Sequence, residues 1–314
     1  MLNKLGEIEN YFQSPHLSQS FLKLFLRDQP RSLQRVKEQK YYYDEKKHFI
    51  QGSLIDFICT MPSTTIDELY YVERPNIKPI PGIMSIINEI VDNNLEFTNE
   101  IIIEFARKQE YQNRQKDATL IENITKHQDY HDSLVEAKGK QIITQEELET
   151  ATICAAALLN GEYTSHYFNN KNIEYQKAIY KRNLKGLLDL CYVNHEVKEA
   201  RVIDIKSTGD YLESFNVFKW RYDFQLSFYS ELLQMEHPSY KILPPVILAV
   251  SKKEPEFAEP FEFTEETLRI GREGGEVNGQ KVLGWEQCLD NYIYWEKHQN
   301  LYSQQLMQNK VNYV

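Results

Sequence analysis

Two aspartates and a lysine stand within short apolar runs, where charged side chains are rare. Asp189 lies in LLDLCYV, and Asp204 and Lys206 lie in ARVIDIK. A buried charge lowers stability unless it pairs with another charge or binds a metal ion. These residues therefore indicate either an internal ion-pair network or a metal-dependent reactive site.

The two apolar runs are predicted to be neighbouring strands of a hairpin, because the polar and turn-prone segment 194–199 separates them. Both runs are too apolar for surface strands, so we expect them to be buried. Alternate side chains of a strand share one face of the sheet. Asp204 and Lys206 should therefore point the same way, while Ile205 faces the other side.

Hydrolysis of a phosphodiester is the chemistry that suits this arrangement. Asp189 and Asp204 could hold Mg²⁺ or Mn²⁺, which prefer oxygen ligands, and the backbone carbonyl of Ile205 could supply another oxygen. Lys206 could orient or deprotonate a metal-bound water and stabilise the charge that builds on the phosphate. The metal ion would polarise the phosphate and lower the pKa of the water.

Two predicted helices bring further polar side chains toward the hairpin. Apolar positions in residues 213–235 recur at broadly helical spacing, and there Gln225 and Tyr229 fall one turn apart on one face. Residues 52–59 are predicted to form a buried helix. Its Asp56 is either a partly exposed helix residue or a metal ligand.

A basic segment precedes the first strand. A helix is predicted over residues 172–180. The formal net charge of −10 excludes indiscriminate coating of nucleic acid, because phosphate neutralisation drives such binding. The basic segment is therefore either a solvated helix face or a local phosphate-binding groove. Residues 171–185 contain Glu174 and five basic side chains: Lys171, Lys177, Lys181, Arg182 and Lys185.

The composition, with 41% hydrophobic and 26% charged residues, is that of an ordinary globular protein. No linker clearly divides the chain, so we expect a single domain over residues 1–314. Within it we expect N-terminal helices over 15–62, a loop-rich and helical insertion over 63–140, and a catalytic core over 141–300. A strongly polar helical stretch is predicted within the insertion, over residues 95–136.

The N-terminus lacks the apolar segment of a signal peptide, and no apolar run approaches about 18 residues. We therefore expect a cytoplasmic protein without membrane contact. The cysteines are far apart and form no CxxC pair, which favours reduced core thiols and gives no support for an iron–sulfur cluster. They are Cys59, Cys154, Cys191 and Cys288.

The order of the polar residues resembles a known superfamily. The pattern is Gly186-Leu187-Leu188-Asp189, 14 intervening residues, Asp204-Ile205-Lys206, and then Gln225-x-x-x-Tyr229 on the next helix. It resembles the PD-(D/E)XK nucleases, and among them the RecB-type and exodeoxyribonuclease VIII-like phage recombination exonucleases. LSQSFLKLF and GSLIDFICTMP are similar to the N-terminal helices of that group, and VILAVSKKEPEF is similar to its later strand and turn.

The resemblance implies an α/β (α+β) fold, in which a mixed central β-sheet is flanked by helices in a restriction-endonuclease-like core. It implies that Asp189 and Asp204 bind the metal ion and that Lys206 is catalytic. Gln225 and Tyr229 would support the site and contact the DNA strand. The side chains expected to bind DNA are Ser18, Arg27, Lys177, Lys181, Arg182 and Lys185.

Two acidic positions are less regular. Where RecB-type enzymes have a metal-binding histidine, this chain has Asp56. A carboxylate there can also bind Mg²⁺, but it changes the charge of the site by a full unit. Glu174 would stand where related enzymes place an acidic helix residue that approaches the metal ion.

The implied activity is Mg²⁺- or Mn²⁺-dependent 5′ to 3′ digestion of linear duplex DNA with free ends, in phage-type recombination or DNA processing. A ring-shaped homo-oligomer and a single-strand annealing protein are the implied partners. Three alternatives stay open: an unrelated α/β protein with an internal ion-pair network, a DNA-binding protein that keeps the nuclease fold without cleavage, and an endonuclease.

Overall fold

The computed structural model describes residues 2–26, 47–61, 63–73 and 78–298. Its contacts divide the chain into two compact units rather than the single domain expected from the sequence. The first comprises residues 1–62 and 151–314, and the second comprises residues 63–150. The expected insertion over 63–140 falls within the second unit.

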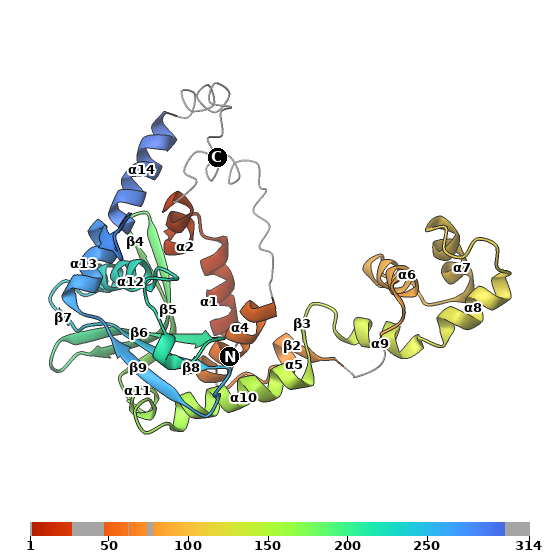
Figure 1. Ribbon diagram of the computed structural model, residues 1–314, viewed down its shortest axis with the longest axis horizontal. Coiled ribbons are helices and arrows are strands. Elements are labelled where there is room, and N and C mark those ends of the chain that lie inside the picture. The colour runs from red at the N-terminus through yellow and green to blue at the C-terminus, as the bar shows by residue number, and fades with distance from the viewer. Residues whose placement is uncertain (1, 27–46, 62, 74–77, 299–314) are drawn as a thin grey trace. The chain divides into compact units, whose positions relative to one another are not determined.

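A mixed β-sheet forms the centre of the first unit (Figure 1). In the described residues it has seven strands in the order β1-β5-β6-β8-β9, with β4 on β5 and β7 on β6. The β1–β5 and β6–β8 pairs are parallel, whereas the β4–β5, β5–β6 and β8–β9 pairs are antiparallel. The expected mixed sheet is thus confirmed. The strands are β1 (Leu17–Ser18), β4 (Ile173–Lys181), β5 (Leu184–Asn194), β6 (Glu199–Thr208), β7 (Lys241–Ile242), β8 (Val246–Ser251) and β9 (Ala258–Glu262).

The helix predicted over residues 172–180 is wrong, because this segment forms strand β4. Ile173, Tyr175 and Ile179 are β-branched or aromatic residues that favour strands. Pairing with β5 along most of its length then satisfies the backbone of β4. The predicted hairpin of β5 and β6 is confirmed.

Helix α12 (Tyr222–Glu236) packs its apolar side chains onto one face of this sheet. Phe224, Phe228 and Leu232 are buried there. A Cβ at Gly186 of β5 would lie 2.8 Å from Leu232 Cδ1, so only glycine allows this close approach. The helix begins later than residue 213, since residues 212–214 form the 3₁₀ turn η2 (Leu212–Ser214) and Arg221 is left-handed, with φ 55°.

Other helices surround the sheet. Helices α13 (Glu265–Glu273) and α14 (Trp285–Lys297) lie on the same side as α12 (Figure 1). The predicted buried helix around Asp56 is confirmed as α4 (Lys47–Thr60). The remaining elements are α1 (Leu2–Gln13), α2 (Gln19–Leu22), η1 (Lys23–Leu26), α10 (Gln145–Asn160), α11 (Ser165–Phe168), β10 (Gly275–Val277) and β11 (Gln280–Val282).

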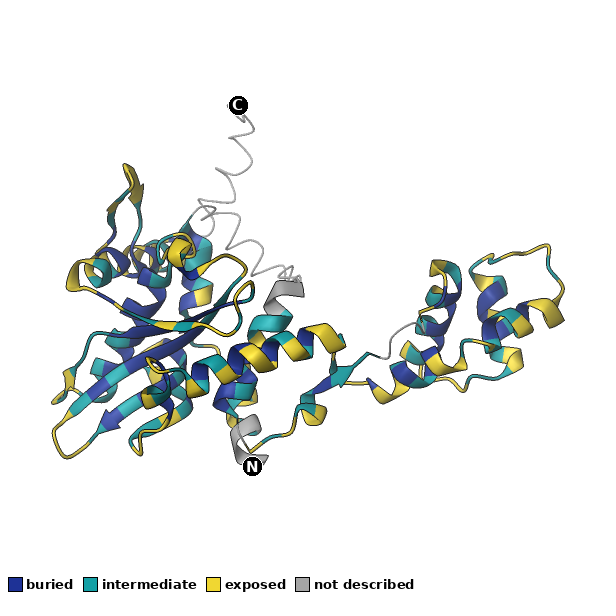
Figure 2. Cartoon of the chain, turned by 60° about the horizontal axis from the view of Figure 1, so that its bottom comes forward, coloured by how far each residue is buried: buried dark blue, intermediate teal, exposed yellow. Residues whose placement is uncertain are grey.

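The second unit has a hydrophobic core of its own. Ile86, Ile90, Ile102, Leu120 and Ile124 are fully buried in it. The polar stretch predicted over 95–136 is three separate helices, whose buried and exposed positions alternate around their axes (Figure 2). The unit contains α5 (Ile66–Leu69), β2 (Tyr70–Val72), α6 (Pro81–Asp92), α7 (Asn99–Lys108), α8 (Asp117–Thr125), α9 (Gln128–Glu136) and β3 (Gln141–Ile143).

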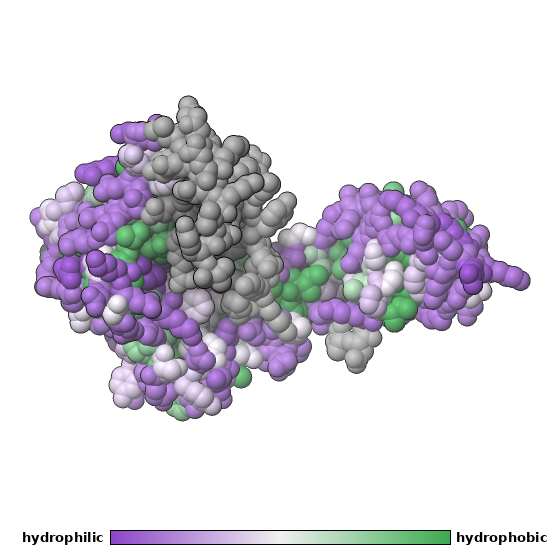
Figure 3. All heavy atoms as spheres, turned by 45° about the horizontal axis from the view of Figure 1, so that its top comes forward, coloured by the Kyte–Doolittle hydropathy of each residue, from purple (hydrophilic) through white to green (hydrophobic). Residues whose placement is uncertain are grey.

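The surface agrees with the charged composition. Outside the residues drawn in grey, the face shown in Figure 3 is mainly hydrophilic. Among the described residues, no helix is both long enough and apolar enough to cross a bilayer.

Candidate active site

The predicted catalytic residues lie where strands β5 and β6 separate. The antiparallel ladder between these strands ends at the pair Leu190–Ile203. Continuing the register by one residue would place Asp189 opposite Asp204. Instead of a ladder bond, the Asp189 carboxylate accepts a hydrogen bond of 2.8 Å from the backbone amide of Ile205. The split in the sheet thus brings both predicted metal-binding carboxylates to one place.

The backbone is irregular at this point. Leu184 and Leu188 of β5 contact the same core as Cys191 and Val193, so the alternation of inward side chains shifts by one residue near Asp189. Directly across the β4–β5 register, Gln176 has a left-handed φ of 48° and makes no ladder pair. Such irregularities cluster at functional sites, because the surrounding fold must hold them in place.

Asp204 and Lys206 share one face, as the strand spacing predicts. Lys206 Nζ lies 2.5 Å from Asp204 Oδ2, and it donates a 3.2 Å hydrogen bond to the carbonyl of Ile205. Gln225 of α12 donates a 3.0 Å hydrogen bond to the other carboxylate oxygen, Asp204 Oδ1. Asp204 Oδ1 therefore accepts a hydrogen bond, whereas Oδ2, which has no hydrogen-bond partner among the described residues, is held by the ion pair with Lys206.

Asp56 reaches the same region from helix α4. Gln176 Nε2 donates to Asp56 Oδ2 at 3.0 Å and lies 2.9 Å from Thr60 Oγ1. The other oxygen, Asp56 Oδ1, is buried and has no hydrogen-bond partner among the residues that the structure describes. A buried carboxylate oxygen without a donor is unfavourable unless a cation or another donor satisfies it.

The acidic groups influence one another's protonation. Burial raises the pKa of Asp56 to about 6; Asp204 contributes to this rise, while Lys206 and Gln176 oppose it. Burial also raises the pKa of Asp189 well above its ordinary value, and the neighbouring charges of Asp56 and Asp204 add to this. All three carboxylates are thus close enough to repel, which a bound cation would relieve.

The same charges favour the protonated, positively charged form of Lys206. Burial lowers its pKa, but the charges of Asp204 and Asp189 outweigh burial, so that the pKa of Lys206 is raised overall. The side chain is therefore a permanent cation at neutral pH. It fits the stabilisation of phosphate charge better than the removal of a proton from water.

The donor set matches a hard divalent cation. Asp56, Asp189 and Asp204 offer carboxylate oxygens, and the orphaned Asp56 Oδ1 is available to a cation. In the described part of the chain, however, no three acidic, histidine or cysteine side chains are close enough together to form a complete coordination group. The residues fit Mg²⁺ or Mn²⁺ by the chemistry of their oxygen donors.

Comparison with known proteins places this geometry in a family. A model of a PDDEXK-like domain of unknown function (DUF3799) matches residues 87–285, which is more than half of the chain. The chain belongs to this PDDEXK-like family. The matched residues include Asp189, Asp204, Lys206 and Gln225. The family match and the geometry of these residues together support a nuclease.

Other comparisons add little. A crystal structure from Eubacterium rectale, named "Putative exonuclease", is 14% identical to this chain and has a TM-score of 0.34. The alignment covers 61% of this chain and 63% of that one. A search of curated proteins found no match.

The basic segment of this PDDEXK-like domain is less accessible than expected. Lys177 pairs with Glu174 at 2.6 Å, and Lys181 pairs with Glu236 at 2.5 Å. Lys185 is buried, and its ammonium donates to the carbonyls of Tyr11 and Ser14 at the end of α1. The charge of Lys185 thus satisfies the C-terminus of a helix, which leaves it less available to DNA than expected.

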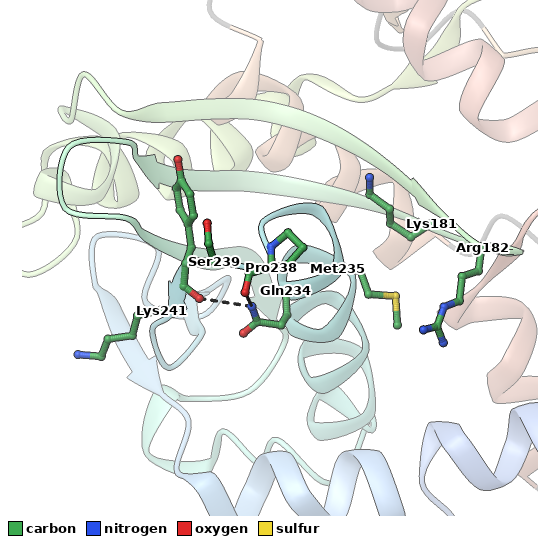
Figure 4. A pocket seen from close by; sticks show the side chains of 8 residues that line it. Lys181, Arg182, Gln234, Met235, Pro238, Ser239 and Lys241 are labelled. Carbon is green, nitrogen blue, oxygen red and sulfur yellow. Dashed lines mark hydrogen bonds between the residues drawn. The ribbon is translucent and has the colours of Figure 1, made fainter.

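Lys181 and Arg182 line a shallow pocket at the far end of α12 (Figure 4). Its volume is about 770 Å³, and Gln234, Met235 and Tyr240 also line it. Met235 is ten residues from Gln225 along α12, which corresponds to about 15 Å of helix. These two basic side chains are thus away from the carboxylates rather than beside them.

Other predicted residues have structural roles. Glu174 forms an ion pair with Lys177, and the left-handed Gln176 lies between the two residues in β4. Ser18 caps α2 by accepting from the amide of Phe21 at 3.2 Å. Tyr229 is buried against Gly186, so it joins α12 to the sheet. Arg27 lies outside the described residues.

Three residues near the site escaped the sequence analysis. Gln176 was assigned to a helix, and its left-handed φ has no local signal. The Tyr222 ring lies 5.5 Å from Lys206 Nζ; its position one turn before Gln225 could have suggested this. Lys23 Nζ donates to the carbonyl of Trp220 at 3.3 Å. The pKa of Lys23 is lowered to about 7, chiefly by burial and then by the nearby charge of Lys206.

Proposed function

We propose that the protein is a Mg²⁺- or Mn²⁺-dependent deoxyribonuclease. It hydrolyses phosphodiester bonds of linear duplex DNA from free ends, in the 5′ to 3′ direction, in phage-type recombination or DNA processing. The observation that carries this proposal is the junction of β5 and β6, where Asp189, Asp204 and Lys206 meet in a family of PDDEXK-like domains.

Each residue has a distinct task in this proposal. Asp189, Asp204 and Asp56 would hold the divalent ion, together with the carbonyl of Ile205. When bound, the ion polarises the phosphate and lowers the pKa of the attacking water. Lys206 holds a positive charge beside the reacting phosphate. Its contact with Asp204 keeps that charge in place before the substrate arrives.

Two glutamines orient the carboxylates. Gln225 fixes Asp204 Oδ1, which leaves Oδ2 directed at Lys206. Gln176 fixes Asp56 Oδ2, which leaves Oδ1 available. Side chains that orient metal ligands in this way commonly change metal affinity or activity by about 10- to 100-fold when they are removed.

The function is tested with Lys206→Ala on linear and covalently closed circular DNA in Mg²⁺ or Mn²⁺. We expect the wild-type protein to degrade linear DNA and to leave circles intact, and the variant to lose about 10³-fold or more in rate while still binding DNA. Lys253→Ala, at an exposed lysine beyond β8, is the matched control and should cleave normally. Unchanged cleavage by Lys206→Ala would remove Lys206 from the mechanism.

The same assay separates the alternative functions. Cutting of closed circles would indicate an endonuclease, and binding without cleavage of either substrate would indicate a DNA-binding protein. Substrates labelled at the 5′ or the 3′ end measure polarity: release of the 5′ label first supports the proposal.

The proposed assembly follows from the resemblance to recombination exonucleases. We expect a homo-oligomeric ring on duplex DNA and association with a single-strand annealing protein. Light scattering with and without linear duplex measures the ring directly, and a monomer under both conditions would contradict it.

A further inference from the structure

Trp220 is a large apolar side chain on the surface of the first unit. It is 61% exposed, whereas Trp285 and Trp295 are 4% and 5% exposed. An exposed indole offers a large flat surface that a ligand or partner can cover. Trp220 is therefore a candidate contact that the catalytic residues do not explain.

The backbone around Trp220 is held firmly. Arg221 adopts a left-handed φ of 55°, and its guanidinium binds the fully buried Asp223 and the carbonyl of Leu283 at 2.7 Å. A Cβ at Gly271 of α13 would lie 2.0 Å from the carbonyl oxygen of Asp223, so α13 packs directly onto the start of α12. The indole thus projects from a fixed support.

This support is continuous with the candidate active site. Tyr222, two residues after Trp220, has its ring 5.5 Å from Lys206 Nζ. Lys23 links the N-terminal η1 turn to the carbonyl of Trp220. The indole is therefore carried by the same segment whose Tyr222 contacts the catalytic lysine.

The surrounding charge favours a phosphate-bearing partner. Lys219 Nζ lies 5.5 Å from the centre of the Trp220 ring, although it also pairs with Asp210 at 3.4 Å. A flat aromatic face with an ammonium group beside it matches a nucleotide, whose base stacks while a phosphate meets the cation.

We propose that Trp220 is a stacking site for an unpaired nucleobase of the DNA end as it enters the active site. This inference rests on the proposed nuclease function and deepens it. The site would prefer a frayed or single-stranded end over a fully paired one, because an unpaired base is free to turn onto the indole, whereas a terminal paired base is held by its partner.

Intrinsic fluorescence tests the stacking directly, since the other two tryptophans are buried. The full chain is titrated in EDTA with a short single-stranded oligonucleotide, and binding is followed in parallel by anisotropy of a labelled strand. We expect binding to quench the exposed tryptophan. Unchanged emission at saturation would overturn the proposal.

Substitution provides the second arm. Trp220→Ala should weaken binding of single-stranded DNA by about 10-fold and abolish the preference for duplexes with unpaired ends, while Trp220→Phe restores most of both. Tyr163→Ala, at another exposed aromatic of 61% exposure, should bind like the wild type. Equal binding by Trp220→Ala and wild type would contradict the inference.

The outcomes separate the two proposals. Quenching by DNA in a protein that cleaves nothing would support the stacking site and refute the nuclease. Cleavage of linear DNA without quenching and without an effect of Trp220→Ala would refute the stacking site alone.

Discussion

The two halves of the candidate site differ in how completely they are satisfied. Around Asp204, one oxygen meets Lys206 and the other meets Gln225. Around Asp56, Gln176 engages one oxygen and leaves the other buried without a partner among the described residues. The Asp204 half is thus held by the ion pair with Lys206 and the bond from Gln225, whereas the Asp56 half leaves an oxygen open to a cation.

The difference between the Asp204 half and the Asp56 half indicates which residues are needed for the reaction and which adjust its metal requirement. A satisfied carboxylate beside a permanent cation provides a fixed electrostatic field. An unsatisfied carboxylate with a raised pKa provides affinity for a metal ion, and it gives up stability when no ion is present. Substitutions in the two halves should therefore differ in size and in kind.

The largest effect is expected from Asp204→Asn. It removes a metal ligand and the partner of Lys206 while keeping the shape of the side chain. Cleavage of linear DNA should fall by about 10³-fold or more, as measured by nucleotide release. Asp290→Asn, at an exposed position of α14, is the control and should cleave like the wild type. Similar cleavage rates for the two variants would show that Asp204 is not needed for the reaction.

Asp56→Asn should have a smaller effect. It removes one ligand but leaves the Asp204 half intact, so we expect about a 10- to 100-fold loss of rate and a higher Mn²⁺ concentration for half-maximal activity. Rate measurements across a Mn²⁺ series test this. An unchanged metal requirement would make Asp56 a structural residue only.

Gln176→Ala should act through Asp56. Loss of the amide frees Asp56 Oδ2, and we expect about a 10-fold loss of rate that excess Mn²⁺ partly restores. Gln234→Ala removes an amide at the other end of α12 and serves as the control. If excess Mn²⁺ fails to restore the Gln176→Ala rate, the link to the metal is wrong.

The smallest effect concerns stability and pH. The pKa of Asp56 is about 6 in the fold, above the ordinary value of about 4 in an unfolded chain. The folded state therefore binds the Asp56 proton more tightly than the unfolded chain does. The stability that this protonation contributes is fully present below pH 4 and is lost as the pH rises through 6. Without divalent ions, Asp56→Asn should gain stability relative to wild type, on the order of 1 kcal/mol, between pH 4 and pH 8. Urea unfolding in EDTA measures it, and a constant difference between the proteins across this range would contradict the assignment.

The residues of the Asp204 half were predictable from the sequence, because strand alternation alone places Asp204 and Lys206 on one face. Asp56 was recognised as a candidate because it interrupts an apolar helix. Gln176 was not, since its role depends on a left-handed backbone and on a contact with a residue 120 positions earlier. The contacts of Lys185 were not predicted, because a lysine in a basic run gives no sign that it will satisfy the end of α1.

The second unit shows a related limit. Average polarity over residues 95–136 suggested one polar stretch, whereas Ile102, Leu120 and Ile124 are buried in a core shared with α6. Only the partners of these side chains reveal the breaks between α7, α8 and α9. The division into two units is likewise set by contacts between residues far apart in the sequence.

A structure of the protein soaked with Mn²⁺ tests the central claim most directly, because anomalous scattering locates the ion. We expect one peak bounded by Asp189, Asp204 and the Oδ1 atom of Asp56, with Lys206 nearby. A peak that excludes Asp56 while Gln176 still holds it would contradict the division of the site into a half held by Lys206 and Gln225 and a half open to a cation.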